Sequence, residues 1–416
     1  MSSFSAELIE SIHQLLVATL EREGNPRSAL TKEILEARLD QLLAVCENAR
    51  ELSFEDKFEI KERIIQRIIG LGPLERLLAD PSITEIMVNG LESVFIERAG
   101  QLVRADINFT SEAEILQIIN RIVSRAGRRI DELSPLVDAR LPDGSRVNAI
   151  IAPLSQIGPV LTIRRFPAEA YTMSRLIENG TVSEPMANFL QAAVAAKQNI
   201  IISGSTGSGK TSTLNALSAL IAPSERVISI EDTAEMRLVH PHLVQLEARQ
   251  ANIEGSGEIT IRTLLKNALR MRPDRIIVGE VRSGEALDML QAMNTGHQGS
   301  LTTIHANAPE EALLRLETMA LMTDIDIPLS AIREQIKSAI HYVVQQERLS
   351  GGARRIVAIS EMALRPSGGG DTGYALRPLF VYDKIKNVFV GERVLPDRLD
   401  LFEQAGVTVN VDWFLN

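Results

Sequence analysis

The chain has 416 residues, of which 45% are apolar and 24% charged, a composition typical of a globular protein with two or three domains. Its net charge of −10 gives no overall positive field that would attract nucleic acid or an anionic membrane. The single cysteine, Cys46, excludes an internal disulfide and a cysteine metal cluster, and its apolar helical position predicts a small core residue.

Membrane-spanning and secretory segments are not expected. No run approaches the ~20 apolar residues that cross a bilayer, and the first residues lack the basic and apolar regions of a signal peptide. We therefore expect a cytoplasmic protein that reaches a membrane only through partners.

Residues 1–70 are predicted to form a helical N-terminal extension. Asn25–Pro26 separates its first two helices, and Ser53 with Asp56 has the spacing of a helix-start box before the third. Apolar residues recur at helical spacing in three stretches, over 8–20, 35–43 and 58–69. Such stripes are more often packing faces than functional sites.

Residues 71–166 are predicted to form a compact α+β domain. Short strands alternate with the tight-turn dipeptides Asn89–Gly90 and Asp143–Gly144, and one helix is expected over Ser111–Ala126. The expected strands cover residues 85–88, 93–98, 147–151 and 160–166. Residues 167–185 are interpreted as a linker with a short helix.

Residues 186–362 alternate apolar strands with helices, which indicates an α/β domain with a parallel sheet and helical crossovers. The expected strands cover residues 200–203, 227–231, 276–279 and 301–305. A small C-terminal segment, residues 363–416, follows and contains a glycine-rich loop over residues 367–370.

A phosphate-binding loop (P-loop) follows the first of these strands and opens a helix. Its residues match the pattern G-x-x-x-x-G-K-S/T and are Gly204, Ser205, Thr206, Gly207, Ser208, Gly209, Lys210 and Thr211, followed by Ser212. Glycines let the backbone aim N–H groups at phosphate oxygens. We expect Lys210 to neutralise the β- and γ-phosphates of ATP and the Thr211 hydroxyl to ligate Mg²⁺. A chance match is disfavoured because the strand and the helix are both in place.

Two predicted strands end in acids at the side of the sheet where α/β proteins bind ligands. Glu280 follows an apolar strand as a Walker B acid would, although the strand ends in Gly279–Glu280 rather than in an aspartate and a glutamate. We expect Glu280 to hold Mg²⁺ through water. Glu231 is the candidate for orienting the attacking water. An ordinary solvated acid is the alternative for each.

Two histidines are candidates for the site. His305 ends a predicted core strand, where a γ-phosphate sensor would lie, and His297 precedes the same strand. A structural role is the alternative for both, and it is the expected role of His240, His242 and His341. A histidine metal site is not expected, because His297 and His305 belong to different elements.

Arginines are concentrated in the second domain, at positions 121, 125, 128, 129, 140, 146, 164 and 165. Arg140 and Arg146 flank a predicted turn and Arg164 lies just before the linker, so these three side chains are candidates for arginine fingers that reach the γ-phosphate. A solvated face is the alternative. A nucleic-acid surface is disfavoured, since aromatic residues make up 4% of the chain and do not interleave with the arginines.

Together these segments resemble the CpaF branch of the type II/IV secretion ATPase superfamily, whose members assemble Tad/Flp pili. The similarity extends from residue 71 to residue 349. Its most specific part is EITIRTLLKNALRMRPDRIIVGEVRSGEALDMLQAMNTGHQGSLTTIHANAP, residues 258–309. Other matching segments are LGPLERLLADPSITEIMVNG (71–90), SPLVDARLPDGSRVNAIIAP (134–153), GPVLTIRRF (158–166), GSTGSGKTSTLNAL (204–217) and SIEDTAEM (229–236).

The resemblance implies a PAS-like α+β clamping domain in front of a RecA-like motor domain. It places Glu231 in the Asp box and Glu280 in the Walker B motif of the family. It also places His297 and His305 in the His box, and Arg146 and Arg164 at the clamp-arginine positions.

The resemblance also implies a task. A homohexameric ring would hydrolyse ATP with Mg²⁺ and act on a polytopic inner-membrane platform, which moves pilin from the membrane into a filament and could also retract it. The alternative is a conjugation-type type IV secretion ATPase or a RecA-like translocase on nucleic acid. A GTPase is disfavoured because the chain has no N/T-K-x-D motif.

Overall fold

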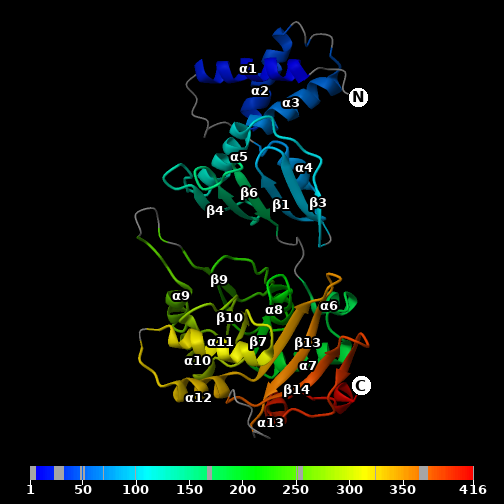
Figure 1. Ribbon diagram of the computed structural model, residues 1–416, viewed down its shortest axis with the longest axis vertical. Coiled ribbons are helices and arrows are strands. Elements are labelled where there is room, and N and C mark those ends of the chain that lie inside the picture. The colour runs from blue at the N-terminus through cyan, green and yellow to red at the C-terminus, as the bar shows by residue number, and fades with distance from the viewer. Residues whose placement is uncertain are drawn as a thin grey trace. The chain divides into compact units, whose positions relative to one another are not determined.

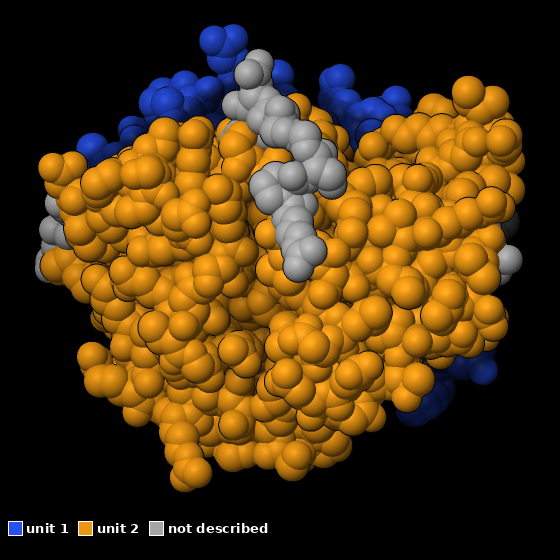
Figure 2. All heavy atoms as spheres, turned by 90° about the horizontal axis from the view of Figure 1, so that it is seen from below, with its two compact units in different colours: residues 1–167 blue, residues 168–416 orange. Residues whose placement is uncertain are grey.

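The computed structural model describes residues 6–22, 32–46, 49, 52–68, 70–98, 100–165, 171–249, 251, 256–323, 325–364 and 373–415. The chain divides into two compact units, residues 1–167 and 168–416, which Figure 2 shows in different colours. We call them the N-terminal unit and, after the RecA-like motor domain that the resemblance predicts, the motor unit. The predicted domain boundary at residue 166 lies beside this division, and the boundaries at 70, 185 and 362 stay predictions.

Three helices open the N-terminal unit and share a small apolar core of their own. They are α1 (Ala6–Arg22), α2 (Lys32–Val45) and α3 (Phe54–Ile68). The helix-start box is confirmed, because Ser53 Oγ accepts a 3.1 Å bond from the Asp56 amide. The predicted break at Asn25–Pro26 lies outside the described residues. Cys46 follows α2 and packs against this core, as the predicted core residue would, but it is only partly buried.

The rest of the N-terminal unit is a six-stranded antiparallel sheet with the strand order β3-β2-β1-β6-β5-β4. Its helix α5 (Glu112–Arg125) buries five apolar side chains in the same core as the strands. The other elements are α4 (Leu74–Ala79), β1 (Ile83–Asn89), β2 (Ser93–Arg98), β3 (Gln101–Arg104), β4 (Leu136–Arg140), β5 (Arg146–Ile150) and β6 (Val160–Arg164).

The motor unit contains a nine-stranded mixed sheet with the order β15-β14-β13-β12-β7-β11-β10-β8-β9. Figure 1 labels its strands β7, β9, β10, β13 and β14. The six strands from β12 to β9 run parallel to one another, and β13, β14 and β15 add an antiparallel extension. The strands are β7 (Ile200–Gly204), β8 (Val227–Glu231), β9 (Leu243–Glu247), β10 (Arg275–Val278), β11 (Leu301–Ile304), β12 (Tyr342–Arg348), β13 (Arg354–Met362), β14 (Leu376–Asp383) and β15 (Val388–Gly391). The predicted C-terminal segment therefore extends the motor sheet.

Helices cover both faces of this sheet, which explains the continuous apolar character of its central strands. Ile200 and Ile202 of β7 lie in one core and Ile201 lies in the other. The first core contains residues of α6 (Met173–Glu178), α7 (Glu184–Ala195), α8 (Lys210–Ser218) and α13 (Leu399–Gln404). The second contains residues of α9 (Ile261–Ala268), α10 (Glu285–Asn294), α11 (Pro309–Leu321) and α12 (Leu329–Ala339).

The parallel strands all point the same way, so their ends form two opposite sides of the motor sheet, which we call the carboxyl edge and the amino edge. Their carboxyl ends, at Gly204 of β7, Glu231 of β8, Val278 of β10 and Ile304 of β11, define the carboxyl edge. The starts of the same strands define the amino edge. Among the described residues, no helix is both long and apolar enough to cross a membrane.

Candidate active site

The P-loop lies at the carboxyl edge, between β7 and α8. Gly207 and Gly209 have φ angles of +73° and +99°, which side chains with a Cβ rarely adopt. A Cβ on Gly209 would lie 2.9 Å from Gln346 Nε2, and one on Gly204 would collide with the carbonyl oxygen of the same glutamine. These glycines are therefore required by the backbone conformation and by the close approach of β12.

Lys210 is the first residue of α8 and is only 8% exposed. Its Nζ donates bonds of 3.0 Å to the carbonyl oxygens of Gly204 and Ser205. Thr211 and Ser212 follow in the first turn and are half-buried. The helix start has no side-chain cap, so its N–H groups and its positive dipole end are directed at the loop. This arrangement suits a phosphate anion.

Glu280, His305 and Lys210 form a connected polar chain. His305 Nε2 lies 2.8 Å from Glu280 Oε1, and His305 Nδ1 lies 3.4 Å from Lys210 Nζ. Burial, followed by the positive charge of Lys210, lowers the pKa of His305. A neutral imidazole with its proton on Nε2 satisfies both contacts, donating to the carboxylate and accepting from the lysine. The structure thus brings three predicted site residues together.

Arg282 completes this chain, and its role was missed in the sequence. Its Nη2 lies 2.6 Å from Glu280 Oε2, and its Nη1 lies 3.5 Å from Asp232 Oδ2. The hydrogen bond to Glu280 raises the pKa of Arg282. Both carboxylate oxygens of Glu280 therefore have a partner, so direct ligation of a metal ion would require His305 or Arg282 to give up its contact. Contact through water, as the sequence suggests, requires no such change.

Glu231 lies beside this group but is held differently. It is 4% exposed, and its Oε2 accepts bonds of 2.8 and 2.9 Å from the amides of Glu235 and Met236. A Cβ on Gly279 would lie 2.9 Å from Glu231 Cγ, so this glycine leaves room for the buried carboxylate. The side chain thus orders the loop after β8, and its predicted role toward water stays a prediction.

His297 is not brought to the P-loop. It precedes β11 and lies at the amino edge, whereas His305 follows the strand at the carboxyl edge. The ring nitrogen Nδ1 of His297 lies 3.3 Å from the Ala292 carbonyl oxygen at the end of α10. Within one chain this histidine has a structural position, because a strand separates it from Lys210.

The other three histidines also make structural contacts. His341 accepts a 3.1 Å bond from the Asn199 amide through Nδ1, and burial lowers the pKa of this imidazole to about 4. His240 Nε2 lies 3.1 Å from the Ala222 carbonyl oxygen. His242 Nε2 lies 2.8 Å from Arg226 Nη1. These contacts agree with the structural role predicted for the three histidines.

The three predicted finger arginines lie on neighbouring strands of the N-terminal unit. Arg146 of β5 is paired in register with Arg140 of β4 and with Arg164 of β6, and Glu85 of β1 follows in the same row. Arg146 Nη2 lies 3.9 Å from Asp138 Oδ1. The row concentrates positive charge, and its action on a nucleotide stays a prediction.

Strands β12 and β13 supply further contacts to the P-loop that the sequence analysis missed. Arg354 Nε donates a 3.1 Å bond to the Gly207 carbonyl oxygen. Gln346 accepts a 2.8 Å bond from the Thr213 hydroxyl in α8. The available signal was the run of polar residues that ends the apolar strand YVVQQER.

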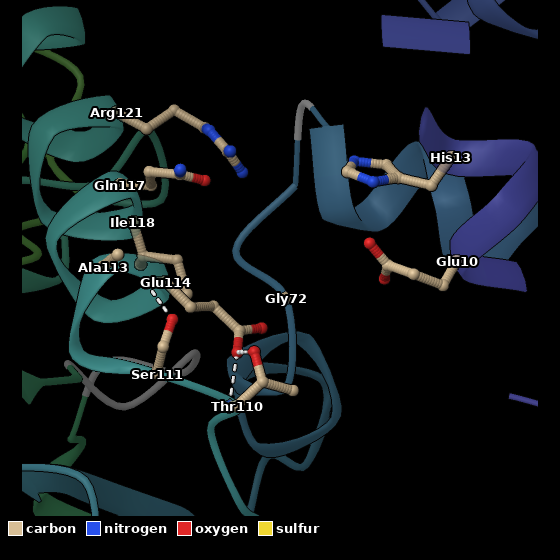
Figure 3. A pocket seen from close by; sticks show the side chains of 10 residues that line it. All are labelled: Glu10, His13, Gly72, Thr110, Ser111, Ala113, Glu114, Gln117, Ile118 and Arg121. Atoms are coloured by element: carbon tan, nitrogen blue, oxygen red, sulfur yellow. Dashed lines mark hydrogen bonds between the residues drawn. The ribbon is translucent and has the colours of Figure 1, made fainter. Parts of the chain in front are cut away.

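A separate polar pocket of about 160 Å³ lies in the N-terminal unit between α1 and α5. Figure 3 shows Glu10 and His13 of α1 on one side and Gln117 and Arg121 of α5 on the other. None of its lining residues is a predicted site residue. It belongs to a different unit from the P-loop.

Residues 68–357 match the family described as type II/IV secretion system protein. The chain belongs to this family. It is 36% identical over 305 residues to a putative conjugal transfer protein of Mycobacterium tuberculosis, covering 72% of this chain and 86% of the relative. It is also 36% identical over 284 residues to the conjugal transfer protein TrbB of Rhizobium radiobacter, covering 67% and 83%.

Among solved structures, this secretion-family chain is similar to the pilus retraction motor PilT with bound ADP. The TM-score is 0.51 at 18% identity, covering 76% of this chain and 84% of PilT. At that identity the similarity concerns the fold. It confirms the predicted fold class, a RecA-like α/β motor domain preceded by an N-terminal domain. The CpaF branch stays a prediction.

Proposed function

We propose that this chain is an ATP-hydrolysing motor of a secretion or pilus machine. The observation that carries the proposal is the polar chain from Lys210 through His305 to Glu280 beside the P-loop. It joins a cation for the terminal phosphates to a carboxylate that can position water, with a neutral imidazole between them.

The residues at this edge fit magnesium and ATP. Residues 204–212 would hold the phosphates, the Thr211 hydroxyl would ligate Mg²⁺ and Glu280 would contact the ion through water. Hydroxyl and carboxylate oxygens are the ligands that Mg²⁺ prefers, and the loop is so closely packed at Gly204 and Gly209 that no larger residue fits there. The ion would neutralise charge on the β- and γ-phosphates.

Each side chain then has a task in hydrolysis. Lys210 would turn from the loop carbonyl oxygens to the γ-phosphate. His305 contacts Lys210 and would therefore act as a sensor of whether the γ-phosphate is bound. Besides its contact with the ion, Glu280 would orient the attacking water, with its carboxylate held by Arg282. We assign this role to Glu280 rather than to Glu231, the candidate from the sequence, because the Glu231 carboxylate is bound to loop amides. Arg140, Arg146 and Arg164 would supply further positive charge from the N-terminal unit.

The machine that we favour from the motifs is a Tad/Flp-type pilus. The similarity of residues 258–309 to the CpaF branch supports this assignment. In that role the chain would be a cytoplasmic homohexamer, bound at the inner membrane through polytopic platform proteins and moving pilin indirectly. It would not bind nucleic acid directly.

A second candidate is a conjugation-type type IV secretion motor, which the names of the relatives favour. Besides the two conjugal transfer proteins, the type IV secretion system protein PtlH of Bordetella pertussis is 35% identical over 326 residues, covering 69% of this chain and 92% of PtlH. A conjugation motor would share the P-loop chemistry and differ in its partners.

ATP turnover by the purified full-length chain distinguishes the two machines. In the first assignment turnover rises with the cytoplasmic part of a pilus platform protein and is unchanged by DNA. In a host strain, Lys210→Ala then removes surface pili and leaves plasmid transfer intact. Loss of plasmid transfer with normal pili would favour the second candidate. A wild-type chain that hydrolyses no ATP, alone or with either partner, would contradict the motor proposal.

A further inference from the structure

Two neighbouring glutamines near the end of β12 are buried in the motor unit. Gln345 and Gln346 are 2% and 1% exposed, and the three residues of the strand before them are apolar. A buried amide side chain costs free energy unless it is hydrogen-bonded. Since successive residues of a strand point to opposite faces of the sheet, the two glutamines reach different parts of the unit.

Gln346 faces the core that contains α8. Val344, two residues before it, lies in that core. Gln346 Oε1 accepts a 2.8 Å bond from the hydroxyl of Thr213, a fully buried residue of α8. The helix that begins at Lys210 is therefore bound to β12.

Gln345 faces the other core, as Val343 does. Its Nε2 donates a 3.3 Å bond to the carbonyl oxygen of Ala306, the residue after His305. Because β7 lies between β12 and β11, the Gln345 side chain crosses over β7 to make this bond. Ser203 of β7 is paired with Gln345, and its small side chain leaves room for the crossing.

The other polar atom of the Gln345 side chain adds no hydrogen bond to the fold. Its Oε1 is buried and has no hydrogen-bond partner in the part of the chain that the structure describes. An apolar side chain of similar size would avoid the cost of burying this oxygen. The contact that favours glutamine at this position is therefore the one to Ala306.

His305 needs a fixed backbone, because its imidazole makes two contacts at once. Its Nδ1 lies 3.4 Å from Lys210 Nζ, and its Nε2 lies 2.8 Å from Glu280 Oε1. A small displacement of the ring would weaken one contact or the other. Ala306 shares a peptide bond with His305, so a bond that holds Ala306 also limits the movement of the imidazole.

We propose that Gln345 is a positioning residue, which acts on ATP turnover by holding His305 in place through the Ala306 carbonyl oxygen. With Gln346, it ties the segment after β11 and the helix of the P-loop to one strand. The proposal rests on the proposed ATP hydrolysis and adds a residue outside the P-loop and the strand-end acids. If Gln345 acts through His305, its substitution should have no further effect once the imidazole is removed.

A double-mutant cycle on the purified full-length chain tests this dependence. Gln345→Met is close in size and removes the donor, so it should lower kcat for ATP hydrolysis about 10-fold and change KM by no more than about 2-fold. In a His305→Ala chain, the same substitution should change kcat by no more than about 2-fold, because the side chain that it positions is absent. Steady-state phosphate release measures all four chains.

Gln345→Asn is a second variant, which keeps a buried amide but shortens the side chain by one methylene. It should give the same losses as Gln345→Met, and it carries the test if the methionine variant does not fold. Trp413 fluorescence during urea unfolding shows whether each variant is folded.

Gln198→Met is the matched control, since Gln198 is an equally buried glutamine just before β7 at the amino edge. Its Nε2 donates a 2.8 Å bond to the Ala196 carbonyl oxygen, and its Oε1 also lacks a hydrogen-bond partner among the described residues. The substitution removes the same groups far from His305, so kcat should stay within about 2-fold of the wild type.

Three results would overturn the positioning role. They are a wild-type kcat in both Gln345 variants, a loss of kcat that is as large in the His305→Ala chain as in the wild type, and an equal loss in Gln198→Met. The last two would assign Gln345 to the general stability of the core. A wild-type chain without ATP turnover would instead contradict the proposed ATPase itself, and the positioning role with it.

Discussion

The two edges of the motor sheet contain similar residue types and use them for different purposes. At the carboxyl edge, Lys210, His305 and Glu280 contact one another through side chains beside a glycine loop. At the amino edge, Arg275 and Glu225 form a buried ion pair, with Arg275 Nε 2.8 Å from Glu225 Oε2. In the first group His305 and Glu280 are half-buried, whereas Arg275 in the second is fully buried.

The amino edge shows what a structural polar cluster looks like in this protein. Arg275 is fully buried and also donates to the carbonyl oxygens of Val194 and Gly299, at 2.9 and 3.2 Å. The Asn199 side chain accepts bonds of 2.7 and 3.0 Å from the amides of Gly299 and Ser300. These bonds tie the starts of three strands together. Polar groups at the amino edge are hydrogen-bonded to one another, whereas those at the carboxyl edge lie beside the P-loop.

The largest expected effect is that of Lys210→Ala at the carboxyl edge. The change removes the cation from the terminal phosphates, so ATP turnover should fall at least about 1,000-fold while the chain stays folded. A steady-state phosphate-release assay with circular dichroism on the same sample measures both. Turnover at the wild-type rate would show that the P-loop is not the working site.

At the amino edge, Arg275→Met should act on stability. The change leaves Glu225 with Lys197, 2.9 Å away, as its remaining ion partner and removes the donor to the buried carbonyl oxygens of Val194 and Gly299. The expected loss is about 2–4 kcal/mol of unfolding free energy. Trp413 is the single tryptophan and packs on the motor core, so its fluorescence during urea unfolding reports on this unit. The exposed Arg270→Met is the control and should be nearly neutral. Equal losses of unfolding free energy in Arg275→Met and Arg270→Met would contradict the structural role of Arg275.

His341 should make the motor unit sensitive to acid. Its pKa is lowered to about 4 by burial, so below pH 6.5 the unfolded chain binds a proton that the folded chain does not. Stability should therefore fall by about 3 kcal/mol between pH 6.5 and pH 4 from this group. His341→Asn should remove that part of the pH dependence of Trp413-detected unfolding. If the unfolding free energy of His341→Asn depended on pH as that of the wild type does, His341 would not be the buried neutral residue that the structure indicates.

The smallest predicted effects concern His305 and His297, which the family resemblance places in one motif, the His box. His305→Ala should lower kcat about 100-fold, since it removes the link between Lys210 and Glu280. His297→Ala should change kcat by no more than about 2-fold, because its side chain lies at the amino edge. Parallel kinetics of the two variants test this, and an equally large loss for His297 would indicate a role outside a single chain.

Part of the fold could be predicted because local pattern and structure agree. β2 and β8 have the predicted bounds of residues 93–98 and 227–231. β3 was missed because all four of its residues are exposed, so it has no alternation between buried and exposed positions. β9 was missed for a related reason, since it is a half-exposed edge strand.

The site was predictable where a motif or a strand end carries it. The P-loop, Glu280 and His305 follow from sequence spacing, because parallel strands end at one edge. Gln346 and Arg354 were not predictable in this way, since their contacts depend on the pairing of β12 with β7. The separation of His297 from His305 also follows from geometry, because the strand between them runs from one edge to the other.

The role of Glu280 is the most direct test of the proposed motor. Radiolabelled ATP mixed with the full-length Glu280→Gln chain allows bound nucleotide and released phosphate to be counted in one sample. We expect ATP to bind as tightly as to the wild type, with release of phosphate reduced at least about 100-fold, because the amide cannot act as a base. Phosphate release at the wild-type rate would contradict the assignment and would move the role to Glu231.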